Sequence, residues 1–169
     1  MLKRIAIFIW LASVCLADDS SRSSDSEFMR QWKKEQARHK KLASEPTPNE
    51  WRSGAVWRFV TTPPRGKPKP EVLIFRVTDQ PGVSCLHDVD WKNVWRKFVV
   101  LEGHVPFGPP IYQVEGRALQ INLSGDMCDA YDTIDGVLTG SNFTGQRTTS
   151  GLGASTEIVG TVSGSFVRQ

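Results

Sequence analysis

The feature that most constrains this chain is an alternation of bulky residues and glycine in its C-terminal part. Side chains of a strand alternate with a period of two, so every second residue shares a face. One face of residues 157–167 carries Ile158, Gly160, Val162, Gly164 and Phe166. Glycine between bulky inward residues suits the taper and bend of a small closed barrel. The stretch from Tyr112 onward therefore predicts the closing strands of a β-barrel.

The preceding residues add further short alternating runs. Residues 55–61 place Ala55, Trp57 and Phe59 on one face. More strands are predicted at 71–78, 91–101, 111–115, 117–124 and 136–144, with a turn at 79–82 and loops at 62–70, 102–110, 125–135 and 146–155. Seven or eight short strands joined mostly by hairpins predict a mainly β, antiparallel up-and-down barrel. A two-sheet β-sandwich is the alternative.

The outline resembles the lipocalin-like (calycin) barrels over about 51–167. Gly54 and Trp57 form a Gly-x-x-Trp at the first strand, where that family has Gly-x-Trp. The arginine that the family places on its last strand has no firm counterpart, although Arg168 lies nearby. The resemblance implies a hairpin meander closed as a barrel, and it transfers no ligand-binding residue.

The first seventeen residues have the pattern of a secretory signal peptide. A short basic start precedes an apolar run at 5–16, which is shorter than the roughly 20 residues of a membrane-spanning helix. Ala17 fits the position before a cleavage site. The pattern predicts an exported protein, periplasmic or secreted, with no transmembrane span in the mature chain. Lipidation at Cys15 is a weaker alternative, because Val14 stands where a small residue is usual.

Residues 18–50 are predicted to be a polar linker and a charged peripheral helix, ahead of a single β-barrel domain at 51–169. The helix is expected at 27–42, where Gly and Pro are absent, and Ser24 with Glu27 has the spacing of a capping box. Its basic residues are Arg30, Lys33, Lys34, Arg38, Lys40 and Lys41. They could contact a membrane surface or a cell-wall polymer, and an ordinary charged surface helix is the alternative.

Export would also decide the role of the cysteines. Cys85 and Cys128 remain after cleavage, and two cysteines in an oxidising compartment most simply form one disulfide. Such a bridge would close a long loop, and the chain-entropy model predicts about 4 kcal/mol of stabilisation for it. Two free thiols are the alternative.

Four aromatic residues are the candidate ligand-binding side chains: Trp57, Phe59, Phe75 and Trp95. In a secreted barrel, aromatic rings can line a pocket and stack on flat apolar groups. The alternative is that they fill the core.

Catalysis would fall to His87, which stands beside Asp88, together with the evenly spaced series Asp126, Asp129, Asp132 and Asp135. The chain has no nucleophile-elbow, zinc-protease or phosphate-loop motif. The aspartate spacing does not match a calcium-binding loop, and Asp is common in turns. We therefore predict no catalytic residue, no bound metal and no cofactor.

These observations predict an exported, non-catalytic β-barrel that binds a small apolar or amphipathic ligand or a partner protein. The alternative is a secreted inhibitor or interaction module that acts through exposed loops such as 62–70, and a hydrolase using His87 and the loop Asp126–Asp135 ranks third. The chain has 21 Lys and Arg against 18 Asp and Glu, and two of the basic residues leave with the signal peptide. This near balance argues against a nucleic-acid partner.

Overall fold

A computed structural model describes residues 19–64, 69–83, 95–105, 108–125, 127, 129–151 and 155–169. The side chains of residues 19–28, 31 and 32 lie outside this description. The chain divides into two compact units between His39 and Lys40. Each unit is described by itself below.

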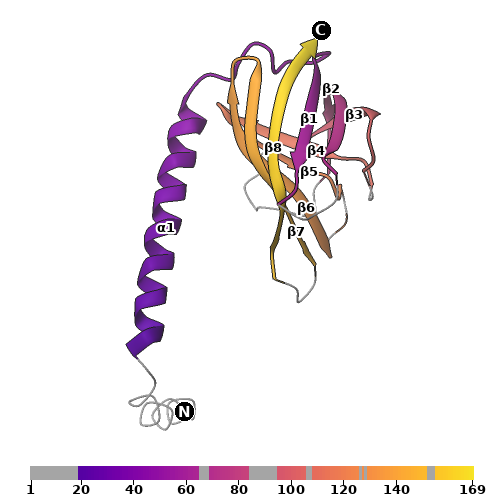
Figure 1. Ribbon diagram of the computed structural model, residues 1–169. Helices are drawn as coiled ribbons and strands as arrows, with labels where there is room; N and C mark the ends of the chain where they lie inside the picture. Colours follow the sequence, from indigo (N-terminus) through magenta and orange to yellow (C-terminus); the bar gives the residue numbers. More distant parts are fainter. Residues whose placement is uncertain are drawn as a thin grey trace, which may run out of the picture. The chain divides into compact units, whose positions relative to one another are not determined.

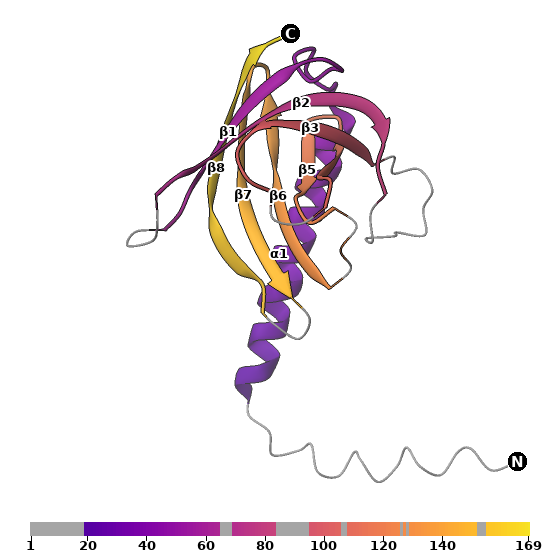
Figure 2. The same ribbon diagram turned by 90° about the vertical axis from the view of Figure 1, so that its right-hand side faces the viewer.

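Within the described residues, eight antiparallel strands close into a barrel in chain order (Figure 1). They are β1 (Val56–Thr62), β2 (Glu71–Pro81), β3 (Arg96–Glu102), β4 (Ile111–Glu115), β5 (Ala118–Asn122), β6 (Ala130–Thr139), β7 (Asn142–Gly151) and β8 (Glu157–Arg168). The last strand lies beside the first, and Thr62 stands opposite Thr161 (Figure 1 and Figure 2). The predicted mainly β barrel is confirmed, and the sandwich alternative is wrong.

The meander gives the barrel two distinct ends. The entry to β1 at 51–55, the β4–β5 turn at 116–117 and the β6–β7 turn at 140–141 lie at one end, which we call the closed end. The β1–β2, β5–β6 and β7–β8 connections lie at the other, which we call the open end. The two ends differ in the side chains that they place inside the barrel.

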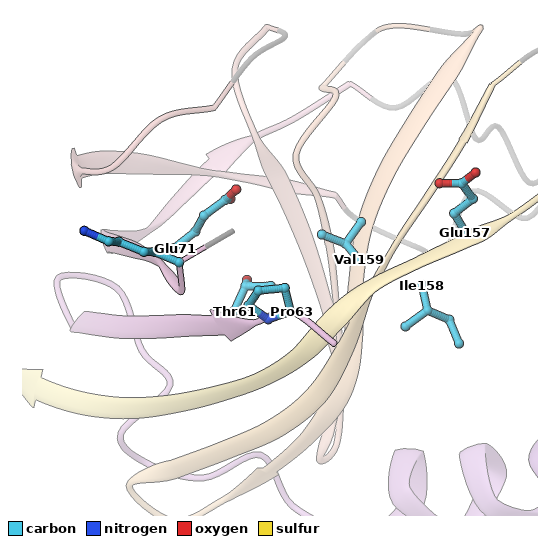
Figure 3. Close-up of a pocket in the computed structure, with 7 residues that line it drawn as sticks. Thr61, Pro63, Glu71, Glu157, Ile158 and Val159 are labelled. Atoms are coloured by element: carbon cyan, nitrogen blue, oxygen red, sulfur yellow. The ribbon is translucent and has the colours of Figure 1, made fainter. Parts of the chain in front are cut away.

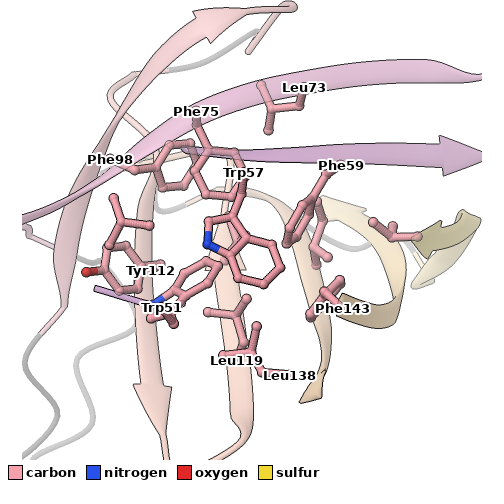
Figure 4. Close-up of a cluster of buried hydrophobic side chains, with 14 of the residues drawn as sticks. Trp51, Trp57, Phe59, Leu73, Phe75, Phe98, Tyr112, Leu119, Leu138 and Phe143 are labelled. Atoms are coloured by element: carbon pink, nitrogen blue, oxygen red, sulfur yellow. The ribbon is translucent and has the colours of Figure 1, made fainter. Parts of the chain in front are cut away.

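Aromatic rings fill the interior at and next to the closed end (Figure 4). Phe59 stacks on Phe143 with ring centroids 4.5 Å apart and planes 14° from parallel. Trp51, which precedes β1, packs on Trp57 with centroids 5.3 Å apart. The indole Nε1 of Trp57 donates a hydrogen bond to the carbonyl of Glu50 at 3.1 Å. Because packed rings occupy this end, it is the hydrophobic core of the barrel.

Inward-facing glycines bring these rings against the backbone. A Cβ atom on Gly164 would lie 2.5 Å from Cε1 of Phe59, and one on Gly145 would lie 2.7 Å from Cζ of Phe143. Any larger residue would push the ring out of its place. The prediction that glycines make room on the inward face is therefore confirmed at these close contacts.

Ile158 does not share that inward face, contrary to the expected alternation. The pairing of β7 with β8 shifts register between Arg147 and Thr148, which leaves Ile158 opposite Thr148. The side chain of Ile158 is 58% exposed. A bulge reverses the faces of the residues that precede it, and period-two reasoning cannot locate it.

Three predicted connections are partly strand in the structure. Residues 79–81 continue β2, where Pro81 pairs with Arg96, so the predicted turn at 79–82 is wrong. The predicted loops at 125–135 and 146–155 are wrong from Ala130 onward and up to Gly151. The predicted strand 136–144 is instead a hairpin that turns at Gly140, whose φ of +54° suits a two-residue connection. The hairpin at Gly116 is confirmed.

The helix α1 (Asp19–Ser44) is longer than predicted. It begins at Asp19 and passes through the expected capping box at Ser24, so residues 19–26, expected as part of the polar linker, are helical. Its side chains from Lys33 to Lys40 are exposed, as expected of a charged peripheral helix.

The C-terminal end of α1 is attached to the closed end of the barrel. The backbone N–H of Arg117 donates to the carbonyl of Leu42 at 2.9 Å, and its guanidinium contacts Glu45 at 2.7 Å. Gly116 has a φ of +56°, and a Cβ there would lie 2.3 Å from the Leu42 carbonyl oxygen. Glycine therefore permits both the turn and the close contact.

Candidate functional site

At the open end, charged side chains replace the aromatic rings on the inward strand faces. Glu71 lies two positions before buried Leu73 on β2, and Asp132 lies two positions before buried Ile134 on β6. Arg147 shares the inward face of β7 with the close-packed glycine described above. The same alternation that builds the core thus brings three charges into the interior.

Arg147 joins two carboxylates inside the barrel. Its Nε donates to Oδ1 of Asp132 at 2.8 Å and its Nη2 to Oδ2 at 2.6 Å, which is a bidentate pair. Its Nη1 donates to Oε2 of Glu71 at 2.6 Å. Since β8 and β1 separate β7 from β2, the guanidinium reaches across the interior.

The two carboxylates differ in how firmly they are held. The side chains of Arg147 and Asp132 are 12% and 11% exposed, whereas that of Glu71 is 64% exposed. The backbone of Asp132 is also fixed, because its N–H donates to Oγ of Ser124 at 2.7 Å. Asp132 is therefore a fixed partner of Arg147, and Glu71 is a solvent-facing one.

The arginine is charged at every accessible pH. Hydrogen bonding of its guanidinium to Asp132 is the largest cause that raises the pKa of Arg147 above its usual range, and it outweighs desolvation by burial. The open end thus contains a permanent, largely enclosed cation that is neutralised by two carboxylates of unequal exposure.

A pocket of about 150 Å³ adjoins this network at the open end (Figure 3). Its lining residues are Thr61, Pro63, Lys69, Glu71, Glu157, Ile158 and Val159. Val159 and Glu157 point to one side of β8 and Ile158 to the other (Figure 3). Glu71 belongs to both the pocket and the ion network. The pocket therefore combines an apolar surface with charges of both signs.

The four predicted ligand-binding side chains lie elsewhere. Trp57, Phe59, Phe75 and Trp95 are all buried, and none of them lines the open-end pocket. The ring of Phe75 packs against Phe59 at 5.0 Å. The structure brings Trp57, Phe59 and Phe75 together in the core cluster, whereas Trp95 is buried but does not belong to that cluster. A ligand-binding role for the four residues stays a prediction.

Several predicted residues lie outside the described part of the chain. Cys85, Cys128 and His87 are among them, so the disulfide and the hydrolase hypothesis stay predictions. Among the described residues, no group of three or more His, Cys, Asp or Glu is placed to hold a metal ion.

The aspartate series does not form one loop. Asp126 lies outside the described residues, and Asp129 is exposed just before β6. Asp132 faces the interior of the barrel, whereas Asp135 is exposed on the same strand. A spacing of three on a strand places neighbours on opposite faces. The expected loop that reaches Asp135 is therefore wrong, because Asp132 and Asp135 lie on β6 and face opposite sides of it.

Sequence reasoning missed Arg147, because it treated residues 146–155 as a connector rich in Ser, Thr and Gly. The signal was present: Phe143, Gly145 and Arg147 alternate on one face of a continuous strand. An arginine on the inward face of a barrel strand requires a carboxylate nearby, and Asp132 is that carboxylate.

The chain matches no protein-family model, no curated protein and no solved structure. The functional argument consequently rests on the geometry of the barrel. Across the part of the chain that the structure describes, no helix has the length and apolar character needed to cross a membrane.

Proposed function

We propose that this protein is an exported, non-catalytic β-barrel that binds a small amphipathic molecule in the open-end pocket. The observation that carries the proposal is the junction between that pocket and the ion network, which Glu71 makes. Apolar carbons of Val159 and Pro63 offer a surface for a hydrocarbon group, and the charges offer one for a polar head. Export is inferred from the signal-peptide pattern of residues 1–17.

The size of the pocket limits the ligand. At about 150 Å³ it is smaller than the roughly 300–1,000 Å³ of pockets that enclose drug-sized molecules. Packed rings occupy the interior beyond it, from Phe59 to the closed end. A short-chain amphiphile that stays at the open end fits these dimensions.

The proposal is tested with three probes that share an eight-carbon chain: octanoate, octanol and octylammonium. Each is titrated into the ¹⁵N,¹³C-labelled full chain, and methyl and amide chemical shifts are recorded. We expect saturable shifts at Thr61 and Val159 for at least one probe. Shifts confined to the outer face of the barrel, or no saturation by any probe, would contradict the proposal.

Two matched variants locate the site. Val159→Trp fills the pocket and is expected to abolish the saturable shifts. Val167→Trp places the same ring on the same strand, at a side chain that is 50% exposed and outside the pocket lining, and should leave binding unchanged. Equal losses in both variants would indicate a general effect on β8.

A second candidate function is an interaction module, and one observation favours it. Val99 and Leu101 on β3 are 47% and 43% exposed, and Arg76 of β2 lies opposite Val99. Exposed apolar residues beside a cation are typical of protein-binding surfaces. Contact of the basic helix with a membrane surface or cell-wall polymer belongs to the same class. Binding of this kind would survive Val159→Trp.

A further inference from the structure

We infer that the open-end site takes an anionic head group of the carboxylate class on Arg147, and that Glu71 occupies this place in the free protein. The inference rests on the proposed function and specifies the chemistry of its ligand. Glu71 would then act as a built-in competitor that the ligand displaces, while Asp132 keeps the guanidinium in position.

The asymmetry of the two carboxylates carries this inference. Asp132 engages Nε and Nη2 together and is almost fully enclosed. Glu71 makes a single contact, to Nη1, and its side chain is 64% exposed. A bidentate enclosed pair resists exchange, whereas a single contact at the edge of solvent can exchange. The exchangeable contact is also the one that reaches the pocket, because Glu71 lines it.

Charge balance favours an anion as the incoming group. A guanidinium has five N–H donors, and the contacts to Asp132 and Glu71 engage three of them. A ligand carboxylate on Nη1 replaces one anion by another, so the enclosed cation stays neutralised, and the freed Glu71 can turn into water. A cationic ligand would add positive charge beside Arg147, and a neutral one would gain nothing by moving Glu71.

The other charges of the pocket nearly cancel. Lys69 and Glu157 both line it and carry opposite signs. Their opposition leaves the contact between Arg147 and Glu71 as the feature that selects the head group. Removing the charge of Glu71 should therefore change selectivity, and removing that of Glu157 should not.

The experiment compares two isosteric variants of the full chain, Glu71→Gln and Glu157→Gln, by calorimetric titration of octanoate and octanol. In Glu71→Gln the affinity for octanoate should rise by about tenfold, because a charge-assisted bond to Arg147 becomes free for the ligand. The affinity for octanol should stay within about twofold. In Glu157→Gln the affinity for octanoate should change by no more than about threefold, as expected of a charge that does not touch Arg147.

Failure of this inference is distinguishable from failure of the proposed function. If octanol or octylammonium saturates the pocket while octanoate binds no better in Glu71→Gln, the pocket is a binding site and the anion inference is wrong. Equal gains in Glu71→Gln and Glu157→Gln would also overturn it, because they would reflect overall charge. If no probe saturates the pocket in any variant, the proposed function itself is wrong. Thermal unfolding of both variants controls for loss of structure.

Discussion

The two ends of the barrel interior are built on the same strands but differ in the side chains that they enclose. At the closed end, Trp51, Trp57 and their neighbours bury apolar rings, an interaction that is non-directional and proportional to the area removed from water. At the open end, Arg147 and Asp132 bury opposite charges, which requires fixed geometry to offset the loss of hydration.

The difference predicts which end contributes more to the free energy of unfolding. Packed rings contribute stability wherever they fit, whereas an enclosed ion pair contributes little net stability and is costly only when one partner is lost. We therefore propose that the charged layer beside the pocket serves recognition rather than stability. Variants at the two ends should therefore separate stability from binding.

The largest effect is expected at the closed end, from Phe59→Ala. The substitution removes a ring that stacks on Phe143 and lies against Gly164, so it leaves a cavity that the rigid barrel cannot close. We expect a loss of about 4 kcal/mol in the free energy of unfolding, measured by denaturant titration. Val167→Ala, at an exposed side chain, should cost less than about 0.5 kcal/mol. A cost below about 1 kcal/mol for Phe59→Ala would mean that this end is not the core.

The next effect is expected at the open end, from Asp132→Asn. The variant keeps the shape of the side chain and leaves the enclosed guanidinium of Arg147 with Glu71 as its remaining anion. Breaking a buried pair in this way should lower the free energy of unfolding by about 3 kcal/mol.

The double variant Asp132→Leu with Arg147→Met is the sharper measurement, because it removes both charges. Its free energy of unfolding should lie within about 1 kcal/mol of that of the wild type, because replacing a buried ion pair by apolar residues is often neutral. If the double variant is as unstable as the single one, the pair is itself a source of stability, and the contrast between the two ends fails.

A smaller effect is expected from pH. Burial is the main cause that raises the pKa of Tyr112 from 10.0 to about 12, and its hydroxyl donates to the Thr78 carbonyl at 2.9 Å. A raised tyrosine pKa means that the folded state holds its proton more tightly. This contribution to the free energy of unfolding is therefore complete below pH 10 and is lost as pH rises toward 12, by about 2–3 kcal/mol in total. The stability of Tyr112→Phe should fall less steeply over this window, and parallel curves would contradict the assignment.

The fold was largely predictable from sequence, and the open-end site was not. Alternation on residues 55–61 and glycines facing bulky residues near the C-terminus both report burial, which is a local property of a strand. The contact between Arg147 and Glu71 depends on closure of the sheet, which brings β7 and β2 within reach across the interior. The register shift between Arg147 and Thr148 and the continuation of β6 back to Ala130 depend on pairing with neighbouring strands, which no single strand encodes.

The smallest effect on stability, and the one that best separates the two ends, is expected from Glu71→Gln. Its side chain is 64% exposed, so the contact with Arg147 should contribute less than about 1 kcal/mol to unfolding. The same variant is expected to raise octanoate affinity by about tenfold, more than Glu157→Gln changes it. Denaturant titration and calorimetry on one preparation measure both quantities. If Glu71 competes with the ligand for Arg147, its substitution should change the free energy of unfolding little and the affinity for the anion strongly. A loss of stability as large as that of Asp132→Asn would instead make Glu71 part of the structural pair and remove the exchangeable contact from the argument.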